Sequence, residues 1–394
     1  MVMTPQRLHA SDPKMLRPIR ITGAMLTFPS SRRPSAGLFF IRDLGGLAAR
    51  GHKVSLFGAS SWLNGKPVTD MVRTEIQTTV RRHFSLPAIR PLVAPITDLH
   101  FAFAEAALEQ PLRAALEGSD VLFVKFMSSI GLLRFAPKDL PAVISIGEGP
   151  ESITRRLAST AVRRRAQLFL PRARCIEVRS EQVADIISRL VPRGPEIAVV
   201  LSGVDLDFFQ TGGMAQARHR LGLPIEQRVV SHVGTNVASK GGARLARAVQ
   251  QISNCVCVVA GPGWPKGRID ESTIGLGTLD PRGVRDLLQA SNAFGLPSES
   301  EGMPNALLEA MACGVPTITG ARHYSDFLQD DVHCIKVDPL DMDAIRNALM
   351  RLLDDRQVAA RIVSNALDRV ATFGLTPRIE RLEQLLASSP AKSA

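Results

Sequence analysis

Residues 297–316 read PSESEGMPNALLEAMACGVP, and this stretch carries the most informative local pattern in the chain. Proline is favoured in the first turn of a helix and glycine just beyond its end, so the stretch predicts a helix over about Pro304–Cys313. Glu301 lies in the loop before this helix, and Glu309 lies within it among apolar residues. A carboxylate in such surroundings needs a partner, which favours a binding role over that of a single surface glutamate.

The start of this predicted helix is suited to an anionic ligand. Helical side chains lean toward the N-terminus, so Glu309 is expected to point back toward the loop that holds Glu301. The N–H groups of Gly302, Met303 and Asn305 are expected at the positive end of the helix dipole, where negative charge is stabilised. We therefore predict that this loop and helix bind an anion.

Apolar runs alternate with helical stretches along the whole chain, which predicts βαβ units and parallel sheets. In sheets of this kind ligands bind at the carboxyl ends of the strands, and three predicted strands of the second half end in glycine-rich loops. The predicted strands are Ile19–Gly23, Lys53–Gly58, Asp120–Phe126, Ala142–Ile146, Ile176–Arg179, Ile197–Leu201, Val229–Val233, Cys255–Ala260 and Ala293–Leu296.

The chain has two halves with similar patterns, and each half is within the usual size range of a domain. We therefore predict an α/β protein with two doubly wound, Rossmann-like domains that face each other across a cleft. We place the first domain at residues 1–195 and the second at 196–372, with SGVDLDFF (202–209) as the connection. Residues 373–394 are expected to hold a helix, because apolar residues recur at helical spacing from Ile379 to Leu386, followed by a frayed tail.

Positive charge is concentrated in the first half of the chain. The chain has 48 Lys and Arg against 37 Asp and Glu, and residues 1–200 hold 28 against 16, so the first half carries +12 and the rest −1. This asymmetry suggests that the first half meets an anionic partner. Nucleic acid is an alternative partner, but aromatic residues make up only 5% and no nucleic-acid-binding motif is present.

Hydrophobic residues make up 45% and charged residues 22%, which is typical of a globular protein. No apolar run approaches the ~18 residues of a membrane span, and the N-terminal residues lack the apolar core of a signal peptide, so we expect a cytoplasmic chain. The five scattered cysteines fit reduced thiols. Cys255 and Cys257 are interpreted as core residues on one strand face, with a metal pair as the alternative.

The glycine-rich loops do not match the common nucleotide motifs. Gly261–Gly263 (GPG) lacks the third glycine of the dinucleotide fingerprint because Lys266 stands there, and no stretch fits the Walker pattern. The two Asp-x-Asp triplets, at 205–207 and 341–343, are interpreted as structural rather than as metal sites. A dehydrogenase or an ATPase is therefore disfavoured, and we predict that no metal or resident cofactor is needed.

The stretch SEGMPNALLEAMACGVP resembles the signature of retaining, nucleotide-sugar-dependent glycosyltransferases of family 4 (glycosyl transferases group 1), which have the GT-B fold. The hallmark is two glutamates separated by seven residues, here Glu301 and Glu309. The family's interdomain linker is resembled by SGVDLDFF. The strand, loop and helix that hold the donor diphosphate in the family are resembled by VVSHVGTNVASKGGARLARAV, and the next strand and loop by VVAGPG. FPSSRRPSAGLFF and LAARGHKVSLF resemble the opening of its acceptor domain.

This resemblance implies a role for each matching residue. Lys240 matches the lysine that binds the donor diphosphate. Glu309 matches the glutamate that accepts hydrogen bonds from the ribose, and Glu301 matches the glutamate close to the donor sugar. Lys240 and Glu301 are the implied catalytic residues. The others that the resemblance places at the donor are Gly37, Gly234, Gly302, Met303, Pro304 and Asn305. The C-terminal helix would cross back onto the first domain.

The chain departs from the family pattern in three places, one of them the N-terminal loop, where the family's paired glycines are reduced to Ala36-Gly37. Thr235 and Asn236 stand where the family often has an arginine, which leaves Lys240 without that help unless Arg244 or another arginine substitutes. The segment ISIGEGPESI lacks a histidine that the family frequently has; Glu148 lies there, and we assign it no role.

The resemblance implies transfer of a sugar from a nucleoside diphosphate sugar to a hydroxyl acceptor, a glycan or a lipid-linked intermediate, with retention by same-face attack. Lys240 and the amides before the helix can stabilise the leaving diphosphate, so a metal is dispensable. The alternatives are a nucleotide-sugar epimerase or a glycogen-type phosphorylase of similar fold, and a basic nucleic-acid-binding protein.

The basic half also suggests a membrane surface. Arg81, Arg82 and Arg90 lie among apolar residues, and cations beside apolar side chains suit peripheral attachment to an anionic leaflet. A solvated arginine-rich helix face and an anionic acceptor are the alternatives. Further basic residues of this half are Arg155, Arg156, Arg163, Arg164, Arg165, Arg172, Arg174 and Arg179.

Overall fold

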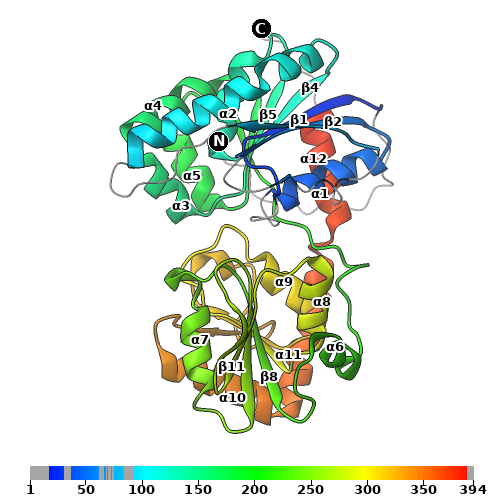
Figure 1. Cartoon of the computed structure of the whole chain (residues 1–394), viewed down its shortest axis with the longest axis vertical. Helices are drawn as coiled ribbons and strands as arrows, with labels where there is room; N and C mark the ends of the chain where they lie inside the picture. The colour runs from blue at the N-terminus through cyan, green and yellow to red at the C-terminus, as the bar shows by residue number, and fades with distance from the viewer. Residues whose placement is uncertain are drawn as a thin grey trace. The chain divides into compact units, whose positions relative to one another are not determined.

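The structure is a computed structural model of the 394-residue chain, and it describes residues 17–30, 37–61, 66, 67, 69, 72, 75–83 and 93–387. It divides into two compact units, each with one seven-stranded sheet (Figure 1). The first unit comprises Met1–Leu201 together with Arg378–Ala394, and the second comprises Ser202–Pro377. The predicted class, an α/β protein with two doubly wound domains, is confirmed. Among the described residues no helix has the length and apolar character that crossing a membrane requires.

The sheet of the first unit is entirely parallel, in the order β3-β2-β1-β4-β5-β6-β7. Its strands are β1 (Arg20–Met25), β2 (Lys53–Ser61), β3 (Gln77–His83), β4 (Val121–Lys125), β5 (Ala142–Ile146), β6 (Cys175–Val178) and β7 (Glu196–Val199). Every residue of β4, β5 and β6 is buried, as expected for central parallel strands with helices on both faces.

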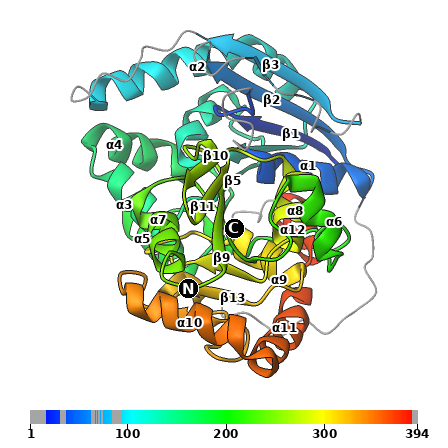
Figure 2. The ribbon, with the colours of Figure 1, turned by 60° about the horizontal axis from the view of Figure 1, so that its bottom comes forward.

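Helices cover both faces of this sheet (Figures 1 and 2). The helices of the first unit are α1 (Leu38–Ala49), α2 (Val93–Leu116), α3 (Pro150–Leu157), α4 (Thr160–Phe169), α5 (Glu181–Leu190) and α12 (Leu375–Ala387), and the 3₁₀ segments are η2 (Met127–Phe135) and η3 (Leu170–Arg172). Gly46 lets α12 approach α1 closely, because a Cβ there would lie 2.5 Å from the side chain of Ile379. The C-terminal helix therefore packs on the first unit although its chain leaves the second.

The sheet of the second unit has the order β10-β11-β9-β8-β12-β13-β14, and only the β10–β11 pair is antiparallel. Its strands are β8 (Arg228–Val233), β9 (Cys255–Ala260), β10 (Lys266–Asp270), β11 (Thr273–Leu276), β12 (Ala293–Leu296), β13 (Thr317–Gly320) and β14 (Ile335–Val337). Its helices are α6 (Met214–Leu221), α7 (Gly242–Val249), α8 (Pro281–Gln289), α9 (Asn305–Ala312), α10 (Met342–Asp354) and α11 (Arg356–Ala371), with η4 (Ala238–Lys240) and η5 (His323–Ser325).

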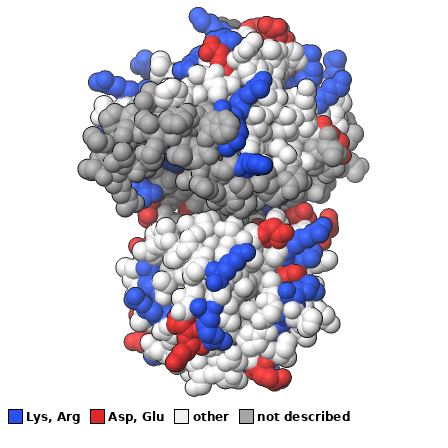
Figure 3. Space-filling view, in the orientation of Figure 1, with Lys and Arg blue, Asp and Glu red and all other residues white. Residues whose placement is uncertain are grey.

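The core of the second unit confirms the interpretation of the cysteine pair. Cys255 and Cys257 are both buried in the apolar cluster beneath α7 and α10, so they share one face of β9. All five cysteines are buried and none forms a disulfide. The opposite face of the sheet packs on α6 and α8. Figure 3 shows basic and acidic side chains mixed over the visible face of this unit, in line with its small net charge.

Candidate functional site

The second sheet brings two predicted loops together at its switch point. Strand order reverses between β8 and β12, which are hydrogen-bonded neighbours, and parallel sheets bind ligands at such a point, beyond the carboxyl ends of the strands. The loop after β8 leads to Lys240, and the loop after β12 leads to Glu301 and α9. The helix predicted at Pro304–Cys313 is observed at Asn305–Ala312, a difference of one residue at each end.

Lys240 and Glu301 form an ion pair across this switch point. Gly241, with a positive φ of 74°, allows the two loops to touch, because a Cβ there would lie 2.1 Å from the carbonyl oxygen of Pro297. The side chain of Lys240 is 29% exposed and that of Glu301 only 10% exposed. The ammonium group is therefore held at the edge of the site, where it can meet an anion.

Further contacts fasten the same two loops. The N–H of Glu299 donates to the carbonyl of Ser239 at 2.8 Å, and the hydroxyl of Ser298 donates to the same oxygen at 3.1 Å. Arg244, on α7, pairs with the carboxylate of Glu299 at 2.8 Å. This ion pair orients Arg244 and makes it a second cation beside Lys240.

The start of α9 provides only part of the predicted set of amides. The N–H of Asn305 donates to the carbonyl of Met303 at 2.9 Å, so it is already engaged. The Oδ1 atom of Asn305 is buried and has no hydrogen-bond partner among the described residues. Glu309 lies one turn further along α9 and is half-buried. Burial, and after it the charge of Glu309, raises the pKa of the Cys313 thiol to about 12.

The first sheet has its own switch point, between β1 and β4. Gly37 lies after β1 and caps α1 with a positive φ of 73°. A Cβ at this position would lie 2.8 Å from the sulfur of Met25 and 2.9 Å from the carbonyl of Thr27, so only glycine fits. The glycine predicted in this loop is therefore required by the backbone itself.

A buried cluster of charges, which sequence reasoning missed, lies at the carboxyl edge of the first sheet. Arg378, on α12, binds both oxygens of Asp43 at 2.8 and 2.7 Å and reaches Glu177 at 3.2 Å. Arg179 contacts the same two carboxylates at 3.6 and 3.3 Å. The ammonium of Lys125 donates to the hydroxyl of Ser145 at 2.8 Å, which in turn donates to Glu177. We call these six residues the Asp43 cluster.

Glu148, to which the sequence assigned no role, lies beside this cluster. Its Oε1 accepts from the N–H of Met127 at 3.2 Å, whereas its Oε2 has no hydrogen-bond partner among the described residues. Burial raises the pKa of the Glu148 carboxyl. Burial, followed by the charge of Arg179, lowers the pKa of Lys125 to about 7. Lys125 in the cluster and Glu148 beside it are thus two buried groups with shifted pKa values.

The lowered pKa of Lys125 predicts a pH-dependent stability. Between about pH 7 and 10.5 the unfolded chain binds a proton on this lysine that the folded chain does not, so the free energy of unfolding rises with pH. Urea titrations at pH 7 and 9 should show wild type gaining up to about 1.4 kcal/mol per pH unit relative to Lys125→Met. Lys53→Met, at an exposed lysine, should keep the wild-type slope. Equal slopes in all three proteins would contradict the prediction.

The structure separates the predicted basic surface into two groups. Arg179 is buried in the Asp43 cluster, and the inclusion of this residue in a surface patch was wrong. Arg165 pairs with the buried carboxylate of Glu105. The exposed members are Arg81, Arg155, Arg156, Arg163, Arg164 and Arg172. Leu168 of α4 lies among them and is 65% exposed. Arg90 and most of its apolar neighbours lie outside the described residues.

The two Asp-x-Asp triplets serve local structure. The carboxylate of Asp205 accepts from the N–H of Phe208 at 3.1 Å, and that of Asp341 caps α10 by accepting from Ala344 at 2.9 Å. Asp343 pairs with Arg346 on the same helix. Among the described residues no group of three His, Cys, Asp or Glu side chains could hold a metal.

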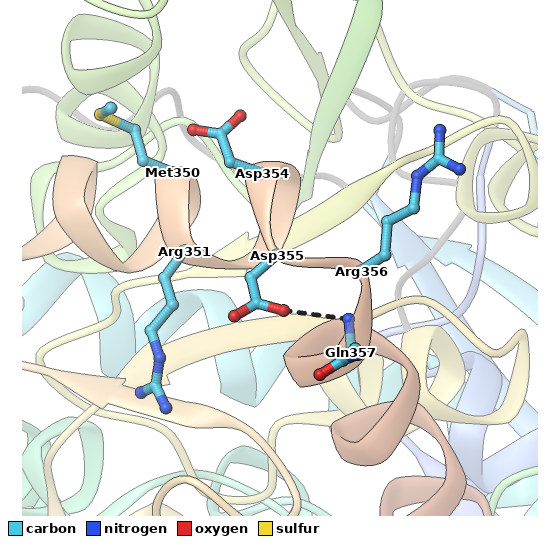
Figure 4. A pocket seen from close by; sticks show the side chains of 6 residues that line it. All are labelled: Met350, Arg351, Asp354, Asp355, Arg356 and Gln357. Atoms are coloured by element: carbon cyan, nitrogen blue, oxygen red, sulfur yellow. Dashed lines mark hydrogen bonds between the residues drawn. The ribbon is translucent and has the colours of Figure 1, made fainter.

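An open hollow of about 620 Å³ lies far along the chain from these loops, where α10 ends and α11 begins. Figure 4 shows Asp355 turned toward the backbone of Gln357, whose N–H it binds at 3.0 Å, while Arg351 and Arg356 point in different directions. Asp355 thus caps α11, and Arg351 pairs with Asp331. The polar groups of this hollow are occupied with local structure and do not converge on a ligand.

Known proteins resemble part of the chain in sequence and almost all of it in fold. Residues 227–355 match the family described as "Glycosyl transferases group 1". The D-inositol 3-phosphate glycosyltransferase of Mycobacterium bovis (strain BCG / Pasteur 1173P2) is 31% identical over 194 residues, 46% of this chain and 39% of that protein. The chain thus spans about two fifths of the length of the curated relatives it matches. The family match lies within the second unit, and it is to the family that the resemblance predicted.

Two solved structures show the same fold over almost the whole chain. Sucrose-phosphate synthase from Thermosynechococcus elongatus has a TM-score of 0.75 at 20% identity, covering 94% of this chain and 98% of that one. Anabaena HepE in complex with UDP-glucose has a TM-score of 0.68 at 15% identity, covering 94% and 100%. These likenesses concern the fold alone, and they confirm the expected GT-B architecture.

Proposed function

We propose that this protein is a retaining glycosyltransferase that moves a sugar from a nucleoside diphosphate sugar to a hydroxyl group of a glycan or a lipid-linked intermediate. The observation that carries the proposal is the Lys240–Glu301 ion pair, set at the switch point of the second sheet and next to the start of α9. The family match of this unit, and the UDP-glucose bound in the HepE structure, support a nucleotide sugar as the donor.

The proposed chemistry follows from the charges at the site. Breaking the bond between sugar and diphosphate leaves negative charge on the diphosphate, and fixed cations stabilise that charge most as it develops. Lys240 and Arg244 supply two cations on adjacent loops. Their carboxylate partners, Glu301 and Glu299, hold them in place before the donor arrives. In this proposal the diphosphate takes the acceptor's proton, so no side chain acts as the nucleophile.

The first test is donor binding. UDP, GDP and ADP sugars are added in turn to the full chain, and the shift in unfolding temperature is measured. A ligand present at 100 times its dissociation constant stabilises the folded state by about 2.7 kcal/mol, which such an assay detects easily. Sugar transfer or donor hydrolysis should persist in EDTA, because the proposed site uses side-chain cations. Loss of activity in EDTA, restored by added metal, would contradict the metal-independent part of the proposal.

The two signature glutamates are predicted to affect different steps. Glu309→Ala should weaken nucleotide binding by about 10- to 100-fold, because a hydrogen bond to a charged group contributes about 1.5–3 kcal/mol. Glu301→Ala should lower turnover more than nucleotide affinity, because this residue is assigned to the donor sugar. Calorimetry with the nucleotide and initial rates separate the two effects. Glu271→Ala, at an exposed glutamate of the same unit, is the control and should change neither. Equal effects of both substitutions on affinity would contradict these roles.

We further propose that the first unit binds the acceptor and attaches to an anionic, cytoplasmic membrane face through α4 and the turn after it. Arg163, Arg164 and Arg172 are exposed there beside Leu168, and cations beside an exposed apolar side chain suit a lipid headgroup region. An acceptor linked to a lipid would be reached from such a position.

Vesicle flotation tests this attachment. Vesicles with phosphatidylglycerol should bind the protein at low salt and release it at high salt, whereas pure phosphatidylcholine vesicles should not bind it. Removing two arginines in Arg163→Ser/Arg164→Ser should weaken binding by about 30-fold, at about 1 kcal/mol per basic residue. Arg189→Ser/Arg193→Ser changes the net charge equally at another surface and should bind as wild type does. Equal losses of vesicle binding in both double variants would show that the net charge alone matters, and this would contradict attachment through α4.

A further inference from the structure

His232, on β8, is fully buried and has one ring nitrogen without a partner. Its Nδ1 lies 2.9 Å from the carbonyl oxygen of Gly295. A carbonyl can only accept, so Nδ1 carries the hydrogen and the neutral ring has a bare lone pair at Nε2. No described residue donates to this Nε2. A buried polar atom without a partner is unfavourable, and in native proteins such an atom calls for a specific explanation.

The free nitrogen faces the two glycines that border the loop of Lys240. A Cβ added at Gly234, just after β8, would lie 2.9 Å from Nε2, and one added at Gly242, the first residue of α7, would lie equally close. Any side chain at either position would therefore cover Nε2. Because both positions are glycine, no side chain covers the buried Nε2 on the side of the loop or on the side of the N-terminus of α7.

Trp264 closes another side of the ring. Its ring lies edge-on to that of His232, with centroids 6.4 Å apart, and its Nε1 donates to the carbonyl of Gly234 at 3.0 Å. A Cβ at Gly242 would also come within 2.8 Å of this indole. This hydrogen bond thus fixes the backbone after β8 beside the histidine.

Burial, with a smaller contribution from a nearby charge, favours the neutral form of His232 in the free protein. Burial, opposed in part by the Gly295 carbonyl and aided by the charge of Lys240, lowers the pKa of His232 to about 4. The neighbouring strands β9 and β12 place Val259 and the Gly295 carbonyl beside it. Arg244 of α7 is the other cation nearby in the chain. Both Arg244 and Lys240 are paired with glutamates of the opposite loop.

We propose that His232 takes up a proton from solvent when the diphosphate of a nucleotide sugar binds at this loop and at the N-terminus of α7, and that its Nε2–H then donates to a phosphate oxygen. The inference rests on the proposed function. Two negative charges at this position would offset Lys240 and favour the charged ring. The N–H groups of a helix start favour the same anion. The proton returns to solvent when the diphosphate leaves.

Proton uptake on binding determines the direction in which the affinity for the nucleotide sugar changes with pH. Binding that takes up a proton becomes stronger as pH falls, and the affinity changes by up to tenfold per pH unit between the pKa values of the free and bound histidine. UDP-glucose is the appropriate probe, since its diphosphate carries a substituent at both ends and lacks the second ionisation near pH 6 of a terminal phosphate. We expect its affinity for the full chain to rise several-fold from pH 7 to pH 6 and to approach a tenfold rise from pH 6 to pH 5.

Two substitutions at His232 separate the roles of its nitrogens. His232→Asn keeps a donor for the Gly295 carbonyl but has no atom at Nε2, so it should bind more weakly at pH 5 and show no rise. His232→Gln places a donor that does not titrate at the Nε2 position, so its affinity should also be flat with pH. His219→Asn, at an exposed histidine of the same unit, should keep the wild-type slope.

Calorimetry of UDP-glucose binding in two buffers of different ionisation enthalpy gives the number of protons taken up. Uptake that disappears in both His232 variants and persists in His219→Asn is the expected result. Binding with the same pH slope in wild type and in His232→Asn would overturn the inference and leave the proposed function intact. If neither UDP-glucose nor GDP- and ADP-sugars bind, the proposed function fails, and the role of His232 fails with it.

Discussion

Replacing Lys240 with alanine is expected to lower kcat/KM for the donor by about 10²–10³-fold, the effect of removing one preorganised group that stabilises developing negative charge. Lys240 is a cation that the structure holds at the switch point, with 29% of its side chain exposed. The diphosphate is already charged in the ground state and gains charge in the transition state. Both nucleotide affinity and turnover should therefore fall.

Lys266→Ala is the matched control, because Lys266 is an exposed lysine of the same unit on β10. Steady-state rates and nucleotide binding are measured for both variants. Lys240→Ala leaves the nearly buried Glu301 unpaired, so its unfolding temperature is measured as well, and Lys240→Ala/Glu301→Gln removes that strain. Full activity in a folded Lys240→Ala protein would exclude this lysine from the reaction.

Replacing Arg378 with methionine is expected to lower the stability of the first unit by about 3–5 kcal/mol, because removing one partner of a buried ion pair leaves uncompensated charge. Arg378 is 5% exposed and forms a two-point contact with Asp43, while also binding Glu177. The charges of Arg378 and Arg179 hold the pKa of Asp43 at about 2 although burial opposes this. Without Arg378 this carboxylate keeps the more distant ion pair with Arg179 and the weaker influence of Lys125.

Urea unfolding followed by circular dichroism measures the loss. Arg381→Met, at an exposed position of the same helix, is the control and should stay within about 0.5 kcal/mol of wild type, as is usual for surface substitutions. If Arg378→Met does not fold, Arg378→Lys keeps the charge but loses the two-point contact, and it should fold with reduced stability. Wild-type stability in both Arg378 variants would show that the Asp43 cluster does not hold α12 in place.

Local sequence patterns predicted central strands of the second unit well. The strands at Cys255–Ala260 and Ala293–Leu296 were placed as observed, because short apolar runs bounded by glycine and proline are complete local signals. The edge hairpin β10–β11 was missed. In β10, the segment KGRID, four of the five residues are exposed, so it carries no apolar pattern and depends on pairing with β11.

Residues that act through distant partners could not be predicted. Asp43, Glu177 and Arg378 each look like a surface charge in the sequence, and the contacts of Arg378 span 335 and 201 residues. Arg179 was placed on a basic surface for the same reason. His232 belongs to no motif, and its unpartnered Nε2 faces two glycines that only the fold brings beside it.

The path of the chain has a consequence for biosynthesis. The first unit is interrupted by the second, and it is completed by the residues from Arg378 onward, which form most of α12. A polypeptide is made from its N-terminus, and its domains fold as units during synthesis. Asp43 and Glu177 are therefore translated well before Arg378 can neutralise them. A ribosome stalled after residue 377 would carry a second unit with all of its sheet and a first unit that still lacks most of α12. The first unit therefore begins to be synthesised first but is completed last.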